Sequence, residues 1–572
     1  MQIGERVDAA AAALVDAVEP PPPRFRMHFD ADRDGQVDDN WMGLARWELG
    51  RGKRGTIVVC NDDDDDRRGV PDNRDGRVNG GNDSSELAPI VIRKHGAGTA
   101  PGSWRGRLEV APVTARRVRI FDARSGGVEV IGPRKGPRYQ LPDLDFTERE
   151  LGIEALFFAG EDGGWDGLVP ITWLIEDDDG VVSRQTGTMR VAPWMMPSHL
   201  EPAEKVFVVD AGAFNHRFRA ELATMVASAG CALQQFPQPD DIWMQDCMEI
   251  GFTFAPQHHM PVVMRAKRDR ELKTFPRTLL QPNFGYEEPT RVPPGDGTFD
   301  STGNLEVTPP VKSRDGRSFP WGRIYLGPGR GGEPFDPAVL RFLHAQGVQS
   351  PIHVDTSWLA VGHVDEVMTF VPAPTGKGFK LLLASPGLAF ELLLSASAAG
   401  QGRARMLIGR DFDGRSAEVS IDDFLDSGIP GLSLGRSRLQ SFNGKAVKRL
   451  AAIRDKLGQE ISLDPDDVIE VPIIFMPNEV QPALADALTT GMVNMLVINR
   501  HCIVPKPYGP VVGGLDLFEQ DLRTKLTPMG LSLKFIDDWF EYHVNLGEVH
   551  CATNTLRRPD PAKWKWWEQD GR

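Results

Sequence analysis

The pattern of apolar residues changes near residue 200, and this change constrains the fold more than any other feature of the chain. From about residue 24 to 198, short apolar segments stand between clusters of Gly, Pro and Asp: TIVVC, PIVIRK, RRVRIF, VEVIG, ALFFAG and RQTGTMRVAP. This spacing predicts an all-β sandwich. Beyond PWMMPSHLEP, strand-like segments alternate with helical ones such as NHRFRAELATMVASAG and DPAVLRFLHAQG, which predicts an α/β domain. We therefore expect a short helix and proline spacer over residues 1–23, the β-sandwich over 24–198 and the α/β domain over 199–572.

The charge of the chain argues against a nucleic-acid-binding protein. Its 65 Lys and Arg residues are outnumbered by 80 Asp and Glu residues, which gives a net charge of −15. Binding to phosphates needs clustered basic side chains, whereas acidic runs favour cations or cationic substrates as partners. No stretch approaches the ~18 consecutive apolar residues of a membrane span, so we expect no membrane partner.

Cysteine usage and the N-terminal residues bear on compartment. Near the N-terminus, Glu5, Asp8 and Asp16 interrupt the basic-then-apolar order of a signal peptide, which favours a cytoplasmic location unless an export signal has been removed. The oligomeric state is left open, with a homodimer as one option. The cysteines are too few and too scattered for a disulfide framework: Cys60, Cys231, Cys247, Cys502 and Cys551.

Two acidic segments in the β-rich part concentrate oxygen ligands. The first, DADRDG, has Asp30, Asp32 and Asp34 at alternate positions before Gly35, as in a calcium loop. The second is Gly-rich and includes Asn61, Asp62, Asp63, Asp64, Asp65, Asp66, Asp72, Asn73, Asp75 and Asp83. Adjacent aspartates repel one another unless a cation lies among them or the loop is fully hydrated. From composition alone, a hard cation and a solvated surface loop are equally good interpretations.

Three segments of the second part combine polar residues with strand-like neighbours. In DDIWMQDCMEIGFTFAP, a strand would put Trp243, Gln245, Cys247 and Glu249 on one face and Asp246 on the other. In SWLAVGHVDEVMTFVP, a strand would put His363 and Asp365 on one face, with Val364 turned away. In LGEVHCATNTLRRP, Cys551 stands beside small residues.

A cysteine, a histidine and two carboxylates could act as nucleophile, acid/base and electrostatic clamp. Each also has a structural alternative. A free cysteine is often a core residue, a lone histidine in an apolar strand is often a hydrogen-bonded core residue, and aspartates often cap turns. Residue spacing alone leaves these alternatives open.

The second part resembles the catalytic domain of the peptidylarginine deiminases over most of residues 200–572. The resemblance is carried by WMQDCMEIGF, FDSTGNLEVTPPV, WLAVGHVDEVMTF, GMVNMLVINRHCIVPKPYGP, FIDDWFEYH, GEVHCATNTLRRP and KWKWW. It implies the pentein fold, a five-fold pseudosymmetric α/β propeller, preceded by an immunoglobulin-like middle domain. The additional N-terminal domain of the vertebrate members is expected to be missing.

The resemblance also implies residue roles. Cys551 is expected to be the nucleophile, His363 the general acid/base, and Asp246 and Asp365 the carboxylates that bind the guanidinium. Trp243, Val361 and Arg270 are expected to contact the substrate, although the Lys/Arg run around Arg270 is also typical of a solvated surface. The implied reaction converts peptidyl-arginine to peptidyl-citrulline through a covalent thiouronium on the cysteine.

The family is calcium-activated, which implies several Ca2+ ions. The first expected site in the catalytic domain uses the side chains of Gln245, Glu249 and Glu306 with backbone carbonyls of Thr302 and Leu305. At the second, Cys247, Arg265 and Ala266 replace expected ligands and only Asp269 remains, so we expect it to be empty or rebuilt. The resemblance also favours Ca2+ at the acidic segment of the β-rich part, with ligands among Asp62, Asp64, Asp66, Asp72 and Asp75.

Three functions are therefore compared. The leading one is a calcium-dependent protein-arginine deiminase acting on arginine-bearing proteins or peptides. The alternatives are a deiminase of free arginine or another small guanidine, and a non-catalytic calcium-binding module on a pentein scaffold. The presence of all four reactive residues argues against the third.

Overall fold

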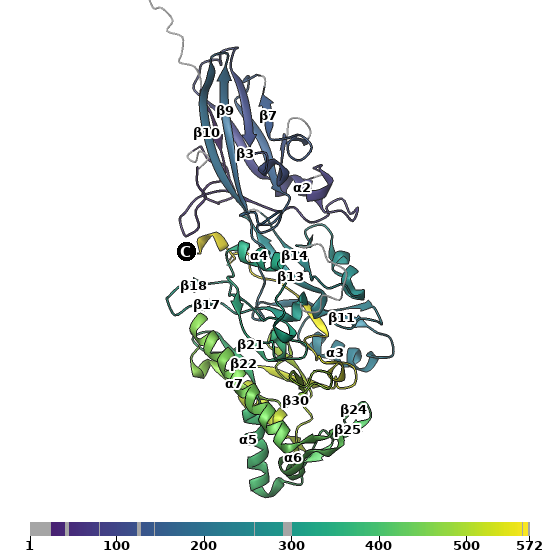
Figure 1. The fold of residues 1–572 in the computed structure, drawn as a ribbon. Coiled ribbons are helices and arrows are strands. Elements are labelled where there is room, and N and C mark those ends of the chain that lie inside the picture. The colour runs from purple at the N-terminus through teal and green to yellow at the C-terminus, as the bar shows by residue number, and fades with distance from the viewer. Residues whose placement is uncertain are drawn as a thin grey trace, which may run out of the picture.

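The computed structural model describes residues 24–39, 45–78, 81–122, 127–141, 143–256, 258–289, 300–562 and 564–569. Figure 1 shows a β-rich part at one end of the molecule and a larger α/β part at the other. The expected helix and proline spacer over residues 1–23 lie outside the described residues. Among the described helices, none combines the length and the apolar character that crossing a bilayer requires.

The β-rich part consists of two five-stranded sheets. All neighbouring strands are antiparallel except β2 and β10, which pair parallel. One sheet has the order β1 (Arg24–His28), β3 (Ala88–His95), β8 (Glu148–Ala155), β5 (Val118–Asp122), β6 (Val128–Ile131). The other has the order β2 (Ile57–Val58), β10 (Gly180–Val191), β9 (Leu168–Asp177), β4 (Arg105–Val110), β7 (Arg138–Leu141).

Both sheets contribute side chains to one apolar core, which is the arrangement of a sandwich. Ile90 and Ile92 of β3 lie in it with Ile171 and Trp173 of β9. The ALFFAG segment differs from expectation, because only its first residue, Ala155, belongs to a strand. Two short helices, α1 (Asp72–Asp75) and α2 (Gly81–Glu86), follow the acidic run.

In the described α/β part, five three-stranded sheets share one pattern. The middle strand of each pairs antiparallel with one neighbour and parallel with the other. In the first sheet the antiparallel neighbour is the last strand of the chain, so the two ends of the α/β part are joined. In the order antiparallel, middle, parallel, the sheets are β37 (Thr553–Arg557), β11 (Ala203–Asp210), β12 (Ala232–Pro237); β13 (Met248–Phe254), β14 (His259–Arg265), β15 (Gly285–Glu287); β16 (Leu305–Val307), β19 (Ile324–Leu326), β20 (Ile352–His353); β21 (Met368–Pro372), β22 (Phe379–Ser385), β29 (Val468–Pro472); and β32 (Leu496–Ile498), β33 (His501–Pro505), β36 (Ser532–Ile536).

Helices connect the parallel strands in four of these sheets, as parallel pairing requires a crossover. The helices are α3 (His216–Ser228), α4 (Pro337–Gln346), α5 (Pro386–Ala396), α6 (Ile421–Ser427), α7 (Arg436–Glu460) and α8 (Leu517–Leu526). The sequence predicts α3 and α4 correctly. In α4, Asp336 caps the N-terminus by accepting a hydrogen bond from the Ala338 N–H at 2.7 Å, and Gly347 ends the helix at φ 75°.

The remaining strands are short and pair in twos. They are β17 (Val311–Lys312), β18 (Ser318–Phe319), β23 (Arg405–Met406), β24 (Asp411–Phe412), β25 (Arg415–Ser416), β26 (Val419–Ser420), β27 (Gly428–Ile429), β28 (Leu434–Gly435), β30 (Phe475–Pro477), β31 (Ala485–Ala487), β34 (Val511–Val512) and β35 (Leu515–Asp516).

The C-terminal tryptophans pack at the junction between the two parts, where Figure 1 places the chain end. Trp566 stacks on Trp47 at a centroid distance of 5.5 Å, and its indole donates to the Phe254 carbonyl at 2.8 Å. The Gly50 N–H donates to the Trp567 carbonyl at 2.9 Å. The KWKWW segment therefore ties the β-rich part to strand β13.

Candidate active site

The two polar segments predicted to be strands are 3-10 turns where their reactive residues lie. Gln245–Cys247 forms a 3-10 helix (η3) and β13 begins only at Met248. Val364–Glu366 forms another (η9), and β21 begins at Met368. The prediction that Trp243, Gln245, Cys247 and Glu249 share one strand face, and His363 and Asp365 another, is therefore wrong. Tertiary and capping contacts stabilise the turns instead of a strand ladder.

Two such contacts hold the turns. Glu366 accepts hydrogen bonds from the backbone N–H groups of Gly362 and His363 at 2.9 and 2.7 Å. The Gln245 N–H donates to the Cys551 carbonyl at 3.1 Å. The second contact links the η3 turn directly to the segment that carries the cysteine.

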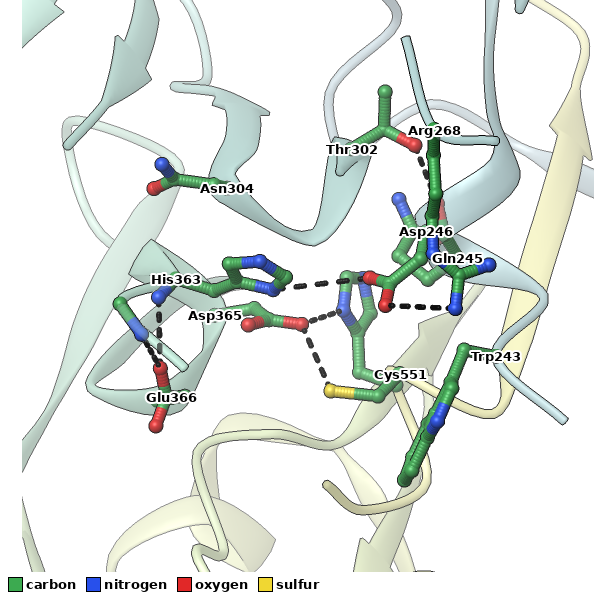
Figure 2. A network of polar contacts seen from close by, with 12 residues as sticks. Trp243, Gln245, Asp246, Arg268, Thr302, Asn304, His363, Asp365, Glu366 and Cys551 are labelled. Atoms are coloured by element: carbon green, nitrogen blue, oxygen red, sulfur yellow. Dashed lines mark hydrogen bonds and ion pairs between the residues drawn. The ribbon is translucent and has the colours of Figure 1, made fainter. Parts of the chain in front are cut away.

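These turns bring the four predicted reactive residues together (Figure 2). The Cys551 thiol donates to Asp365 Oδ2 at 3.3 Å, and His363 Nδ1 lies 3.7 Å from Asp246 Oδ1. Gly303 lies against three of these four residues. A Cβ at Gly303 would lie 2.7 Å from His363 Nδ1, 2.9 Å from Asp246 Oδ1 and 3.3 Å from Asp365 Oδ2, so only glycine fits there.

Burial and like charge shape the protonation of these groups. Burial raises the pKa of the Cys551 thiol well above its usual range, and Asp365 and Asp246 raise it further. Burial also raises the pKa of Asp246, against the opposing effect of His363 and Arg268. Among the described groups, Oδ1 of Asp246 and Oδ1 of Asp365 have no hydrogen-bond partner. Two buried carboxylates with unused acceptors suit a cation that carries several N–H donors.

Arg268 is a site residue that the sequence does not predict. Its guanidinium is 1% exposed, donates to both oxygens of Asp241 at 2.7 and 2.9 Å, and lies 3.9 Å from Asp246 Oδ2. Such a bidentate pair fixes the position of a buried charge. Arg268 therefore positions Asp246 from behind. Arg268 belongs to a Lys/Arg run, a pattern that is typical of a solvated surface. The sequence therefore does not predict that Arg268 is buried.

Asn494 is a second residue missed by the sequence. Its Oδ1 accepts the backbone N–H groups of His550 and Cys551 at 3.0 and 3.2 Å. Its Nδ2 donates to Cys551 Sγ at 3.2 Å and to the Asp365 carbonyl at 3.3 Å. Asn494 thus holds the cysteine segment and the η9 turn in one geometry. The polar residue within the apolar run GMVNMLV was the available signal.

The three predicted substrate-contact residues differ in position. Trp243 packs against Gly547, where a Cβ would lie 2.4 Å from its ring and 3.1 Å from Cys551 Cβ, so the indole flanks the thiol. Val361 is partly buried and directly precedes the turn that bears His363. Arg270 is partly exposed at the start of a 3-10 helix, η4 (Glu271–Thr274). Among the described residues, the Arg270 side chain makes no hydrogen bond or ion pair with the four reactive groups.

A small polar cavity lies beside the reactive residues, and the side chains of Gln245, Glu249 and Glu306 all line it. Gln245 Nε2 donates to Glu249 Oε2 at 3.1 Å. Burial and the nearby Glu306 raise the pKa of Glu249 well above its usual range. Two buried carboxylates and an amide oxygen fit a hard cation such as Ca2+. Thr302 and Leu305 do not line this cavity, and the Thr302 carbonyl accepts the Leu305 N–H.

At the second expected cation position, the polar side chains pair with protein groups. Arg265 pairs with Glu288, and Cys247 donates its thiol to the Met244 carbonyl at 3.3 Å. Asp269 pairs with Lys273 at 2.6 Å, and Ala266 has no ligand group. A dication beside the Arg265 guanidinium would be repelled.

In the β-rich part, one oxygen each of Asp63, Asp65 and Glu86 lie within 4.8 Å of one another. Burial, with neighbouring carboxylates, raises the pKa of Asp63 to about 7 and of Glu86 to about 10. A shared cation would relieve this repulsion.

The predicted ligands of this acidic segment are placed differently from one another. Burial and neighbouring carboxylates raise the pKa of Asp72 to about 8, beside the Asp63 cluster. Asp64 accepts N–H groups of its own loop from Arg68 and Gly69, and Asp66 pairs with Arg68. Asp62 is fully buried against Gly285 of the α/β part. The side chain of Asp75 lies outside the described ones. In the other acidic loop, Asp30, Asp32 and Asp34 do converge.

Comparison with known proteins adds an independent result. Residues 181–568 match the family model for protein-arginine deiminase, and residues 25–176 match the model for the middle domain of protein-arginine deiminases. The chain is 36% identical over 561 residues to protein-arginine deiminase type-3 of Homo sapiens, covering 94% of this chain and 81% of the relative. It is 33% identical over 563 residues to the type-4 enzyme of Mus musculus, covering 94% and 82%.

Solved structures give a weaker likeness. An agmatine deiminase of Enterococcus faecalis is 12% identical, with 64% of this chain and 96% of that chain covered and a TM-score of 0.36.

Proposed function

The chain belongs to the protein-arginine deiminase family and hydrolyses peptidyl-arginine to peptidyl-citrulline and ammonia; we propose that Cys551, His363, Asp246 and Asp365 carry out this reaction. The observation that supports these roles best is the convergence of His363, Asp246 and Asp365 on Gly303, with the Cys551 thiol hydrogen-bonded to Asp365. A buried thiol beside two carboxylates with unused acceptors matches a substrate that is both cationic and electrophilic at carbon.

The two carboxylates are proposed to bind the substrate first. A guanidinium stays protonated in proteins and presents N–H donors in a planar fork, so Asp246 and Asp365 can each accept charge-assisted hydrogen bonds from it. The guanidinium of the substrate would also replace the hydrogen bond between the Cys551 thiol and Asp365. Its positive charge beside Sγ favours the thiolate, which lowers the barrier to attack.

The reaction then proceeds in two steps. His363 takes the proton of the Cys551 thiol, and the thiolate adds to the guanidinium carbon. His363 then gives this proton to the departing nitrogen, so the C–N bond breaks and ammonia leaves. A covalent S-alkylthiouronium remains on the cysteine. His363 next takes a proton from water, whose oxygen attacks the same carbon and displaces the Cys551 sulfur. The products are citrulline and the regenerated cysteine.

We propose a preference for peptide substrates over free arginine because the relatives are named protein-arginine deiminases. Trp243, beside the reactive cysteine, would pack along the methylene stem that both substrates share, and Val361 precedes the turn next to His363. We expect kcat/KM for a doubly blocked arginine peptide to exceed that for free arginine by at least about 10-fold. Citrulline release measured for both substrates checks this. A preference for free arginine would assign the chain to small guanidines.

We also propose that Ca2+ binds at Gln245, Glu249 and Glu306. When bound, the ion would neutralise the buried carboxylates and order the η3 turn, which carries Asp246. Backbone carbonyls of Thr302 and Leu305 are kept as proposed additional ligands. Further Ca2+ is proposed at the acidic segment, with Asp63, Asp65 and Glu86 beside the predicted Asp72.

Replacing Glu249 by Gln tests the first calcium site. The change keeps the shape and removes one ligand charge, so the calcium concentration that gives half-maximal citrulline release should rise about 10-fold. Glu288→Gln is the matched control, because Glu288 pairs with Arg265 at the position where no ion is expected. An unchanged calcium midpoint in Glu249→Gln contradicts the site, and a shift in the control would assign Ca2+ to the second position.

The five repeated sheets support the proposal that the α/β part, residues 199–572, is a five-fold pentein propeller. The pairing of β11 with β37 would close the ring. The sandwich of residues 24–198 is proposed to be the immunoglobulin-like middle domain.

A further inference from the structure

A cluster of two histidines and one carboxylate lies one residue from the reactive cysteine. His199 Nε2 is 3.3 Å from Glu306 Oε2, and His550 Nε2 is 3.3 Å from Glu306 Oε1. The ligand atoms all lie within 4.8 Å of one another. The side chains are 12%, 8% and 7% exposed for His199, His550 and Glu306. The reaction described above uses none of these three groups.

The Nδ1 atom of each imidazole already has a hydrogen-bond partner. His199 Nδ1 is hydrogen-bonded to Thr369 Oγ1 at 3.1 Å, and His550 Nδ1 to Asp365 Oδ2 at 3.0 Å. A carboxylate can only accept, so His550 Nδ1 carries the proton and a neutral His550 has its lone pair on Nε2. Metal-binding histidines in proteins are oriented by such second hydrogen bonds, often to a carboxylate. Both Nε2 atoms therefore face Glu306 in the orientation of ligands.

Glu306 is the second observation that points to an ion. Its Oε1 accepts no hydrogen bond from any described group, although the side chain is more than nine-tenths buried. The three side chains line the same small cavity as Gln245 and Glu249. A buried carboxylate oxygen without a donor is costly unless a cation occupies the space in front of it.

We propose that His199, His550 and Glu306 form a binding site for a first-row transition-metal dication, with Zn2+ as the ion that fits best. Zn2+ bonds to nitrogen and carboxylate oxygen at about 2.0–2.2 Å, which separates neighbouring ligand atoms in a tetrahedron by about 3.4 Å. His199 Nε2 lies 3.3 Å from Oε2 of Glu306 and His550 Nε2 lies 3.3 Å from Oε1, so each imidazole is within about one such edge of a carboxylate oxygen. Ca2+ prefers oxygen ligands, so two imidazoles select against it.

Arg557 is the one opposing charge at this cavity among the described residues that line it. Its guanidinium donates to the backbone carbonyls of His199, Glu201 and Val497, at 2.8 to 3.3 Å. Glu249 and Glu306 line the same cavity and together outweigh that charge. Neutral imidazole is the ligand form, so metal binding would release any proton carried on Nε2 of His199 or His550.

Zn2+ bound at this site would use Glu306 as a ligand, so Glu306 could no longer bind Ca2+. The proposed calcium site uses the same carboxylate, so the two ions exclude each other and the transition metal would inhibit a calcium-activated enzyme. This competition rests on the calcium site proposed above. The metal site itself does not, and it is tested in calcium-free solution.

The test uses the full chain stripped of metal by a chelator and titrated with Co2+, because tetrahedral Co2+ absorbs visible light strongly. We expect the visible band to saturate at one equivalent, to disappear when Zn2+ is added, and to be absent in His199→Gln. The control is His95→Gln, from the cluster of His28, Asp39 and His95, where the Asp39 side chain is 69% exposed. This control should keep the band.

Other outcomes would overturn the site. These are no band in the parent chain, an unchanged band in His199→Gln, or a sulfur-to-cobalt charge-transfer band that Cys551→Ala removes. Should His199→Gln not fold, Thr369→Val removes only the acceptor at His199 Nδ1 and should weaken Co2+ binding about 10-fold. Unchanged affinity in that variant would also overturn the site.

The calcium competition has its own readout. Zn2+ should raise the calcium midpoint for citrulline release in the parent chain but not in His199→Gln. Calcium-independent turnover in the parent would reject the calcium proposal, while the cobalt titration would still report on the metal site.

Discussion

Cys551→Ala should lower citrulline formation from a blocked peptidyl-arginine by roughly 10^4-fold or more, because the nucleophile cannot be replaced by its neighbours. The thiol is held by Asn494 Nδ2 at 3.2 Å and by Asp365 Oδ2 at 3.3 Å. Water in the same position would have to attack a resonance-stabilised cation without forming the covalent intermediate that divides the barrier in two. Citrulline release under saturating Ca2+ is the measurement.

Cys231→Ala is the matched control, since it removes a second buried thiol from the same α/β part. That thiol donates to the Ala203 carbonyl at 3.2 Å, far along the chain from the reactive residues. The control should keep parental turnover. Acid quenching of the parent enzyme during turnover should also leave a substrate-derived adduct on Cys551. Turnover in Cys551→Ala within 10-fold of the parent would refute the role of nucleophile.

The sequence predicts the parts of this site whose structure depends on residues close together in the chain. It misses the parts that depend on tertiary contacts. The helix α3 follows from its apolar spacing, because Phe218, Leu222 and Val226 recur on one buried face. The alternation around Asp246 and His363 is just as regular, yet both residues lie in or beside 3-10 turns. A few alternating residues cannot distinguish a strand from a turn that distant contacts stabilise.

Long-range pairing explains the missed residues as well. Arg268 is buried because Asp241, 27 residues away in sequence, neutralises it, and no local pattern reports that pairing. Gly303 is needed because three reactive side chains converge on it from two turns. The acidic segment illustrates the same limit, because its composition predicts a cation site without showing which aspartates form it. The conformation of the backbone brings Asp63 and Asp65 together and turns Asp64 toward N–H groups of its own loop.

Asp365→Asn should lower kcat/KM for the blocked peptide by roughly 10^3-fold, since it removes half of the proposed guanidinium clamp. Truncating one partner of a buried charge pair typically costs about 2–5 kcal/mol. The substituted amide also turns one acceptor into an N–H donor, which would face the N–H groups of the substrate. Asp355→Asn is the control: Asp355 is exposed in the same connecting segment and caps Ser357, so its variant should keep parental activity.

The stability of Asp365→Asn separates a functional role from a structural one. Asp365 and Asp246 are buried together, and the charge on Asp365 raises the pKa of Asp246, so the empty site holds two carboxylates that repel each other. Removing one charge relieves that repulsion, and the amide oxygen of the substituted side chain can still accept the hydrogen bonds from His550 Nδ1 and the Cys551 thiol. The thermal unfolding midpoint of the variant without substrate should therefore equal or exceed that of the parent, while its activity collapses. Loss of stability in parallel with activity would show that Asp365 holds the fold together and does not bind the guanidinium.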